Sequence, residues 1–582
     1  MNKFLCMMAL IAAPMAAMAD EDAGKTRTVE LKIVETSDVH GSFYPYDFLA
    51  KRNQKGSLAC VSTYLKEQRA QYGDNLLVFD NGDILQGQPT AYYYNFEDTT
   101  STHVVSDMLN YLGYDAGNMG NHDVETGHAV YDRWIKECKY PVLGAKIIRT
   151  ATGEPYLPPY AVFEREGVKI AVLGMITPAI PSWLPERLWS GLRFDDMKTC
   201  AEKWVKVIQE KEQPDVMVGL FHAGQGGNTL GAVVEYPSMD IAREVPGFDV
   251  VLIGHDHTRD VQHIANVKGD SVWVLNPANK AHFVAEATLR LTLKKGHVVE
   301  KKIEGRLASM DDYAVDQAFV NRFQPQYEAV SAYVSRRIGT LSETLSACDA
   351  FFGPSAFIDL IHTLQLQISG ADISFCAPLS YNARIKSGDI TVADLFNLYK
   401  FENMLYVMRM TGSEIKNYLE MSYGMWANQM QSPDDHLLLL SEKEGSDERG
   451  VNFQYFTFNF DSAAGIQYTV DVTKPVGERI TITAMADGTP FQADREYRVA
   501  LNSYRGNGGG DLLTLGAGIP KDELASRLIS STDKDLRYYL IEYIQQHPDL
   551  RPQVLNQWKF VPEDWTRPAA QRDFDLLFGR KK

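Results

Sequence analysis

Cysteine is scarce in this chain of 582 residues, which contains six, and none of them stands in a Cys-x-x-Cys pair. This excludes a small domain held together by disulfides or by a cysteine-bound metal. Basic residues are also in deficit, because 58 Lys and Arg face 75 Asp and Glu, for a formal net charge of −17. An acidic body argues against a nucleic-acid polymer as partner, since binding a polyanion needs a broad basic face.

Long apolar runs are absent beyond the N-terminus, so we expect no membrane span. At the N-terminus, Lys3 precedes the apolar run 4–17 and the triplet Ala17-Met18-Ala19. This pattern is typical of a secretory signal peptide and predicts that residues 1–19 are removed and the chain is exported to the periplasm. The remaining cysteines are expected mainly as buried thiols, with at most one or two disulfides that the sequence does not assign. They are Cys60, Cys138, Cys200, Cys348 and Cys376.

The length and the pattern of the chain indicate two main domains. Residues 28–306 alternate short β-rich runs with helical stretches, which is typical of a layered α/β domain. Apolar residues then recur at helical spacing and predict one long linker helix within residues 311–338. A second domain is expected over 339–560, with a charged insertion at 433–450, and a tail over 561–582.

Five predicted strands of the first domain end in turns rich in potential ligands. The strands are expected at 28–35, 76–79, 111–116, 216–221 and 250–253. Their turns contain Asp38, His40, Asp83, Asn121, His122, Asp123, His222, His255 and His257. Open α/β sheets place their ligands at the carboxyl ends of strands, so we expect these carboxylate, carboxamide and imidazole groups to converge.

Such a mixture of oxygen and imidazole ligands suits Zn, Mn, Fe or Co. A metal pair about 3.5–4 Å apart needs a bridging carboxylate and can clamp the attacking and leaving oxygens of a phosphate ester. Asp38 and His40, separated by one residue, can reach one ion, and Asp83 is the natural bridge. The sequence therefore predicts two divalent metal ions.

The motifs in their order resemble a known superfamily. Asp-x-His-Gly (38–41), Gly-Asp-x-x-x-Gly (82–87), Gly-Asn-His-Asp (120–123), His-x-Gly (222–224) and Gly-His-x-His (254–257) are similar to those of calcineurin-like metallophosphoesterases. With its second domain, the chain resembles the 5'-nucleotidase family, which includes periplasmic 2',3'-cyclic-nucleotide 2'-phosphodiesterases. The resemblance implies an α/β fold, in which a four-layer α/β/β/α sandwich is joined by a long helix to a second, α+β substrate-binding domain.

The resemblance also implies the site. One metal would be held by Asp38, His40, Asp83 and His257, and the other by Asp83, Asn121, His222 and His255. His122 would be the catalytic histidine near the departing oxygen. Its acidic partner would be Glu125, where many relatives have Asp, or else Asp123.

Substrate residues are implied in the second domain. In the family two aromatic side chains sandwich the base, and the matching positions are Phe401 and Tyr504, with Asp511 as the acid that contacts base or ribose. Asn382 and Arg384 are candidate phosphate or ribose contacts. They belong to the segment 377–384, which departs from the Asn-Gly-Gly-Gly-Ile-Arg loop of true 5'-nucleotidases and is closer to the cyclic phosphodiesterase branch.

The favoured hypothesis is an exported, monomeric, dinuclear-metal hydrolase that acts on small nucleotides. The expected activity is that of a 2',3'-cyclic-nucleotide 2'-phosphodiesterase with 3'-nucleotidase activity, in nucleotide salvage. A 5'-nucleotidase or UDP-sugar hydrolase with the same metal site is the first alternative. The second is a non-catalytic nucleotide-binding surface protein, which would predict a broken ligand set, whereas all seven ligand positions are filled.

Overall fold

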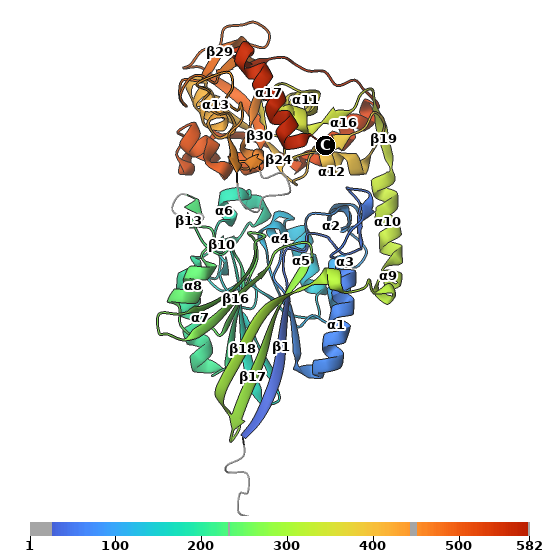
Figure 1. Ribbon diagram of the computed structural model, residues 1–582, viewed down its shortest axis with the longest axis vertical. Helices are drawn as coiled ribbons and strands as arrows, with labels where there is room; N and C mark the ends of the chain where they lie inside the picture. The colour runs from blue at the N-terminus through green and yellow to red at the C-terminus, as the bar shows by residue number, and fades with distance from the viewer. Residues whose placement is uncertain (1–25, 228, 231–232, 443–450, 580–582) are drawn as a thin grey trace, which may run out of the picture.

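The computed structural model describes residues 26–227, 229–230, 233–442 and 451–579. Two domains follow one another along the long axis, and helix α10 (Gln324–Ser335) runs along one side between them (Figure 1). The predicted signal peptide, and residues 443–450 of the predicted insertion, lie outside the described residues. No helix in the described ranges is both long and apolar enough to cross a membrane.

The N-terminal domain contains two six-stranded sheets. The first has the strand order β18-β17-β1-β4-β5-β6, and β1, β4, β5 and β6 run parallel. Its strands are β1 (Thr26–Thr36), β4 (Leu76–Asp80), β5 (Ala116–Asn118), β6 (Val142–Leu143), β17 (Phe283–Lys294) and β18 (His297–Ser309). The parallel core explains why the turns after β1 and β4 meet at one edge.

The second sheet has the order β15-β16-β14-β11-β9-β8, and β9, β11, β14 and β16 run parallel. Its strands are β8 (Tyr160–Arg165), β9 (Val168–Ile176), β11 (Val216–His222), β14 (Val250–Ile253), β15 (Arg259–Ala265) and β16 (Ser271–Pro277). Apolar runs such as Val216–Phe221 are buried throughout, as expected for strands that are covered on both faces.

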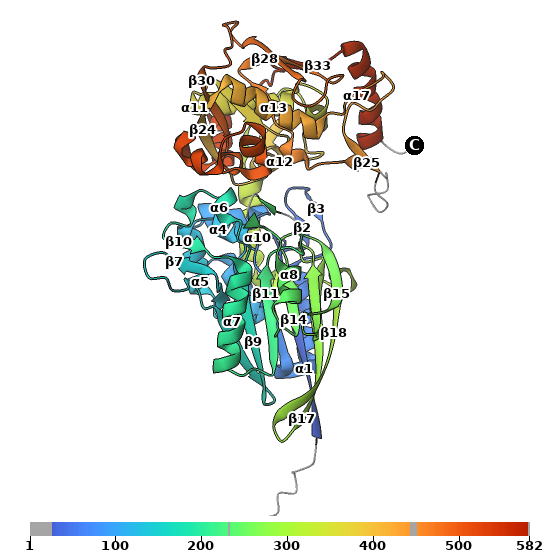
Figure 2. The ribbon, with the colours of Figure 1, turned by 90° about the vertical axis from the view of Figure 1, so that its left-hand side faces the viewer.

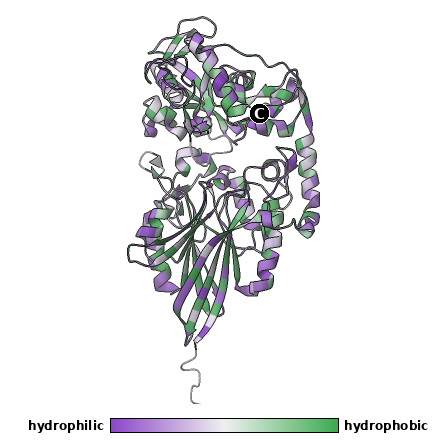
Figure 3. Ribbon diagram, viewed as in Figure 1, coloured by the Kyte–Doolittle hydropathy of each residue, from purple (hydrophilic) through white to green (hydrophobic). Residues whose placement is uncertain are grey.

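One hydrophobic core joins the two sheets, with Ile33 and Phe79 from the first and Val172, Val218 and Leu252 from the second. Helices α1 (Leu58–Tyr72), α3 (Val104–Leu112) and α5 (His128–Glu137) lie on one side. Helices α7 (Met197–Lys211) and α8 (Ser238–Glu244) lie on the other (Figure 2). Hydrophobic residues concentrate in the strands and hydrophilic ones on the outer helices (Figure 3). The expected α/β/β/α sandwich is confirmed.

The linker contains two helices, so the expectation of a single long helix is wrong. Helix α9 (Gln317–Arg322) begins where the Asp316 side chain accepts a hydrogen bond from the Ala318 amide. Phe323 then leaves the helical conformation, with φ −104° and ψ 15°, and α10 starts with Pro325 in its first turn. Proline has no amide hydrogen and clashes with the preceding turn, so it begins a new helix more readily than it continues one.

The C-terminal domain is built on a five-stranded sheet of order β27-β21-β30-β24-β31. Its strands are β21 (Ile373–Cys376), β24 (Met404–Thr411), β27 (Ser462–Ala464), β30 (Glu496–Asn502) and β31 (Leu528–Asp535). The helices around it include α11 (Ala356–Ser369), α12 (Val392–Leu398), α13 (Gly412–Trp426) and α16 (Leu536–Gln546). This is an α/β domain with an aromatic-rich core of its own, and a second buried cluster continues from it through the linker into the N-terminal domain.

The described part of the tail forms helix α17 (Glu563–Phe578), which packs on the C-terminal domain. The ring of Phe578 stacks with that of Phe351 at 6.1 Å between centroids, and Leu577 is buried. The five cysteines of the described residues are free thiols, and Cys60, Cys200 and Cys376 are buried.

Candidate metal centre

The predicted ligands meet at the carboxyl edge of the two sheets. The turn after β1 contributes Asp38 and His40, and the turn after β4 contributes Asp83. His222 ends β11, while His255 and His257 follow β14. The short helix α4 (Asn121–Glu125) brings Asn121 to the same edge, which faces β24 and α12 of the C-terminal domain (Figure 1).

These side chains form two adjacent clusters. Asp38, His40 and His257 form one, and Asp83, His222 and His255 form the other, with ligand atoms of each cluster within 4.8 Å of one another. In the second cluster His222 Nε2 lies 3.1 Å from both Asp83 Oδ2 and Asn121 Oδ1. The seven predicted ligands therefore lie around these two clusters.

The turns that hold the clusters adopt strained backbone conformations. Asp38, His40, Asp83, His255 and His257 all have positive φ, between 48° and 77°. Such conformations cost about 1–3 kcal/mol each for residues other than glycine and concentrate at functional sites. A Cβ on Gly120 would lie 2.2 Å from Asp83 Oδ1, and one on Gly254 would lie 2.6 Å from Asp38 Oδ2. Glycine at these two positions lets one turn lie against the carboxylate of the next, since a larger residue would clash with it.

Nδ1 of two histidines, His222 and His40, already faces a backbone carbonyl, which leaves Nε2 of each ring to bind a metal ion. His222 Nδ1 donates to the Asn81 carbonyl at 2.6 Å, and His40 Nδ1 lies 3.3 Å from the Gln86 carbonyl. His40 Nε2 is 2.9 Å from His257 Nε2, so two nitrogens converge on one point. Burial lowers the pKa of His40 to about 3, and a neutral imidazole is the form that binds metal.

Two buried carboxylate oxygens indicate that the clusters fit metal ions. Asp38 Oδ1 and Asp83 Oδ2 are inaccessible to solvent, and each faces an imidazole nitrogen, His257 Nε2 at 3.3 Å and His222 Nε2 at 3.1 Å. Burial alone would raise the pKa of Asp38, but the charges of His222 and His257 lower it to about 2. A carboxylate oxygen and an imidazole nitrogen this close together are costly to bury unless a proton or a metal cation lies between them. The two clusters are therefore suited to a pair of divalent cations.

His122 lies beside the clusters, on α4. Its ring centroid is 5.5 Å from that of His40, and its amide donates to Asp83 Oδ1 at 2.8 Å. His122 Nδ1 lies 2.6 Å from Glu125 Oε2, so the glutamate that departs from the family pattern still reaches the imidazole. Burial would lower the pKa of His122, but the charges of Asp83 and Glu125 raise it to about 9.

Asp123, the alternative partner, has a different role. Its carboxylate accepts hydrogen bonds from the backbone amides of Asp83, Ile84, Leu85 and Gly120, at 2.8 to 3.0 Å. These bonds fix the turn after β4 against the start of α4. Asp123 therefore holds the backbone of the metal-binding turns, and Glu125, not Asp123, lies against the imidazole of His122.

The loop of Tyr504 docks beside the second cluster. Asn507 Nδ2 donates to the Trp183 carbonyl at 3.0 Å, and the Trp183 ring lies 5.6 Å from the ring of His255. A Cβ on Gly509 would lie 2.5 Å from the Tyr504 ring, so glycine there lets the half-buried ring lie against the loop. Asp511 ends this loop at φ 58° and accepts a hydrogen bond from the Thr514 hydroxyl.

Phe401 belongs to a second loop at the same interface and is half-buried. Its neighbour Glu402 interacts electrostatically with His122 and Glu125 across the interface. Asn382 is exposed on another loop, and Arg384 is exposed at the start of strand β22 (Arg384–Ile385), where its charged neighbour is Asp349. In the described ranges no hydrogen bond or ion pair joins these two residues to the metal-ligand clusters.

Three residues near the centre carried no signal in the sequence. Glu235 Oε1 lies 3.1 Å from His255 Nε2, Trp183 contacts the His255 ring, and Glu402 faces His122. None of them stands in one of the motifs. Glu402 belongs to the other domain, and Trp183 and Glu235 lie in segments between the motifs, so only folding brings the three residues to the site.

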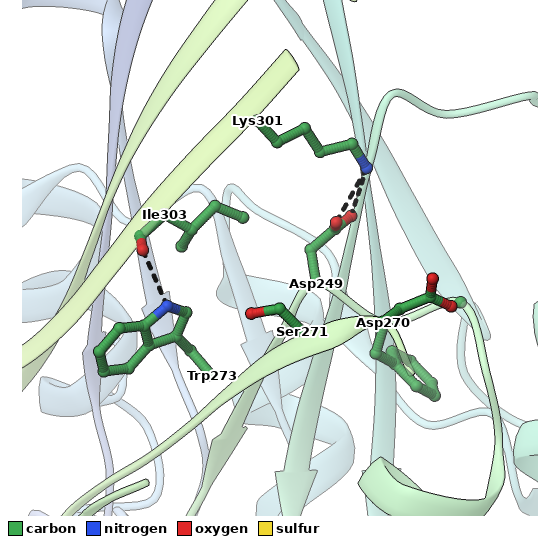
Figure 4. A pocket seen from close by; sticks show the side chains of 8 residues that line it. Asp249, Asp270, Ser271, Trp273, Lys301 and Ile303 are labelled. Atoms are coloured by element: carbon green, nitrogen blue, oxygen red, sulfur yellow. Dashed lines mark hydrogen bonds and ion pairs between the residues drawn. The ribbon is translucent and has the colours of Figure 1, made fainter. Parts of the chain in front are cut away.

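A cavity of about 380 Å³ lies at the opposite end of the second sheet, beside the starts of β14 and β16 (Figure 4). Its polar side chains have partners within the protein. Lys301 pairs with Asp249 at 2.8 Å, and the Trp273 indole donates to the Ile303 carbonyl at 2.8 Å. This cavity therefore offers no group that calls for a ligand.

Comparison with known families agrees with this geometry. Residues 31–259 match the calcineurin-like phosphoesterase family, so the N-terminal domain is a metal-dependent phosphoesterase domain. Residues 337–516 match the C-terminal domain of 5'-nucleotidases. With both domains present, the chain belongs to the 5'-nucleotidase family of metallophosphoesterases.

Individual relatives are distant. The chain is 26% identical to a 2',3'-cyclic-nucleotide 2'-phosphodiesterase/3'-nucleotidase of Haemophilus influenzae, over 92% of this chain and 88% of that protein. It is also 26% identical to the trifunctional nucleotide phosphoesterase protein YfkN of Bacillus subtilis, over 95% of this chain but 41% of YfkN. A putative 5'-nucleotidase structure from Staphylococcus aureus has the same fold, with a TM-score of 0.75 at 22% identity, covering 91% of this chain and all of that one.

Proposed function

We propose that the protein hydrolyses 2',3'-cyclic nucleotides to 3'-nucleotides and then removes the 3'-phosphate. The observation that carries the proposal is the meeting of two metal-ligand clusters with two aromatic loops of the other domain. The Tyr504 loop docks beside His255, and the Phe401 loop lies beside His122. A nucleotide has a base for the aromatic rings and a phosphate for the metals, so it fits both halves.

The choice of the cyclic ester has two supports. One is the segment 377–384, which departs from the loop of true 5'-nucleotidases. The other is that relatives named as 2',3'-cyclic-nucleotide 2'-phosphodiesterase/3'-nucleotidase align over 92–94% of this chain, whereas those named UshA align over 68–80%.

Roles for the residues follow from the geometry. Asp38, His40, Asp83, Asn121, His222, His255 and His257 would hold two divalent ions, with Zn, Mn, Fe or Co compatible with the mixed donors. Bound there, the ions supply Lewis acidity for water and for the phosphoryl oxygens. Water adds to phosphorus, the bond from phosphorus to the 2' oxygen breaks, and that oxygen takes a proton from His122. Glu125 orients the imidazole through Nδ1, which leaves Nε2 for the leaving oxygen.

The direct test compares 2',3'-cyclic AMP, 3'-AMP and 5'-AMP as substrates of the purified protein with Mn²⁺ or Co²⁺. Faster turnover of the cyclic and 3' esters is the expected outcome. Preference for 5'-AMP would instead identify a 5'-nucleotidase. If none of the three esters reacts, the proposal is wrong, and nucleotide sugars are the next substrates to test. Metal analysis of the protein as purified identifies the native ions.

We also propose that the protein is exported, on the strength of residues 1–19 alone. The expected outcome is a mature N-terminus at Asp20 in the exported fraction. N-terminal sequencing that finds Met1 in that fraction would contradict the predicted cleavage.

A further inference from the structure

Glu402 lies in a loop between α12 and β24 that a buried arginine holds in place. Arg537 donates through Nε to the Tyr399 carbonyl at 3.1 Å and through Nη2 to the Lys400 carbonyl at 2.8 Å. Its guanidinium lies 3.9 Å from the centre of the Phe396 ring. Arg537 is 1% exposed, so the loop that precedes Glu402 is fixed to the interior of the C-terminal domain.

The carboxyl group of Glu402 is buried and incompletely bonded. The residue is 5% exposed, and Oε2 has no hydrogen-bond partner. Oε1 lies 3.7 Å from Arg537 Nη1, a nitrogen that also lacks a hydrogen bond. A buried polar atom left unpaired costs about 1–3 kcal/mol, and buried polar atoms in native proteins rarely lack partners. This carboxyl group therefore lacks a partner that a ligand could supply.

The charges around Glu402 select the kind of ligand. His122 and Glu125 face it from α4, and Asp535 and Arg537 face it from its own domain. Asp535 in turn accepts a hydrogen bond from the hydroxyl of Tyr92, on helix α2 (Pro89–Tyr92), at 3.1 Å. Two further carboxylates disfavour an anionic group such as phosphate. A hydroxyl group suits the site, because it pairs with a carboxyl in either protonation state.

Burial favours the neutral form of this carboxyl. Removal from water raises the pKa of Glu402 to about 8, against the opposing effect of Arg537. At neutral pH the group then carries a proton and donates a hydrogen bond, as a hydroxyl oxygen requires. The protonated carboxyl therefore suits the same ligand, a hydroxyl group, as the unpaired oxygen does.

The position of Glu402 indicates that the hydroxyl belongs to the ribose of the nucleotide. Phe401, the residue before it, is the candidate base-stacking aromatic, and His122 marks the phosphate end of the site. In a nucleotide the ribose joins base to phosphate. We propose that Glu402 binds a free ribose hydroxyl of the nucleotide and so favours substrates that carry that hydroxyl over substrates that lack it. This inference rests on the proposed function and names the contact through which the C-terminal domain recognises the sugar.

The test uses 3'-AMP together with its 2'-deoxy and 5'-deoxy counterparts. Wild-type protein should turn over one deoxy substrate less efficiently than 3'-AMP, by about 3- to 10-fold in kcat/KM, the effect of one hydrogen bond. Glu402→Met, which keeps the volume but removes the hydrogen bond, should lose a similar factor on 3'-AMP and nothing on that deoxy substrate. Glu402→Gln, whose amide can still pair with a hydroxyl, should restore most of the loss.

The matched control is Asp359→Asn, which neutralises another buried carboxyl of the same domain. Asp359 is 3% exposed and accepts a hydrogen bond from the Leu555 amide at 2.8 Å. This variant should treat the three substrates as the wild type does. Thermal unfolding of all variants separates lost recognition from lost folding.

Two outcomes would overturn the inference. One is a Glu402→Met variant that loses activity equally on all three substrates, which would assign Glu402 a purely structural role. The other is a wild-type protein that turns over 3'-AMP and both deoxy substrates equally, a result that does not depend on any variant folding. Failure of the wild type to hydrolyse any nucleotide would instead refute the proposed function first.

Discussion

The two sides of the domain interface are built differently. On the N-terminal side, strand ends hold the ligands in turns with positive φ, and glycines allow the turns to approach within van der Waals contact. On the C-terminal side, Phe401 and Tyr504 are half-buried on loops: Arg537 fixes the first within its own domain, and Asn507 bonds the second to Trp183 across the interface. All seven predicted ligands of the first arrangement come from one domain, whereas the aromatic loops reach the metal-ligand clusters only where the two domains meet. We therefore expect catalysis to depend on groups of the N-terminal domain, and substrate binding to depend on both domains.

The largest expected effect comes from changing Asp83, the ligand that is predicted to bridge the two metal ions. Asp83→Asn should lower kcat by more than about 10⁴-fold, because each ion of a metal pair contributes several kcal/mol. Metal analysis should find fewer than two ions per chain. Asp487→Asn, at an exposed turn of the C-terminal domain, should change neither quantity. Full activity in Asp83→Asn would mean that the metal assignment is wrong.

Changing His122 separates catalysis from metal binding on the same side. His122→Asn should lower kcat by about 10²- to 10³-fold, the usual contribution of a general acid. Metal content should remain at the wild-type value, since His122 is not one of the predicted ligands. Glu125→Gln should show a smaller loss in kcat of the same kind, because it replaces the carboxylate at His122 Nδ1 with an uncharged amide. A loss of metal in His122→Asn would assign the imidazole to the ligand set.

Adding a methyl group at a turn tests whether backbone approach matters. Gly120→Ala places a carbon 2.2 Å from Asp83 Oδ1, so the turn must shift and metal affinity should fall about 10- to 100-fold. Gly226→Ala is the matched control, because its Cβ meets only the Tyr236 carbonyl, at 3.7 Å. Titration of the metal-free proteins with Mn²⁺ measures both. Equal affinities would show that the turns tolerate movement.

The smallest effect should come from the C-terminal side. Tyr504→Ala should raise KM for 3'-AMP about 5- to 50-fold and leave kcat and metal content near wild type, because base stacking contributes about 1–3 kcal/mol. Tyr539→Ala, which removes another half-buried tyrosine of the same domain, on helix α16, is the control and should not change KM. If Tyr504→Ala lowered kcat instead, recognition and chemistry would not be divided between the domains as the comparison suggests.

The metal ligands could be predicted from the sequence because each lies next to a strand end whose direction the topology fixes. Glu125 was predicted as one of two partners of His122, and the choice needed the fold, because both carboxylates are within reach along α4. The break at Phe323 was missed, since apolar spacing alone does not reveal that Pro325 starts a second helix. The Arg384 loop was assigned to the substrate by resemblance, and its place at the site is still a prediction.

By itself the sequence determined the candidate ligands, the order of the turns and the resemblance to the family, because these depend on residue types next to strands in a known order. Only the tertiary structure decided which groups from distant segments share the site. Glu235, Trp183 and Glu402 are separated from the motifs along the chain and reach them through the packing of the sheets and the contact between domains. Such contacts depend on how two surfaces fit, and no local spacing in the chain encodes that fit.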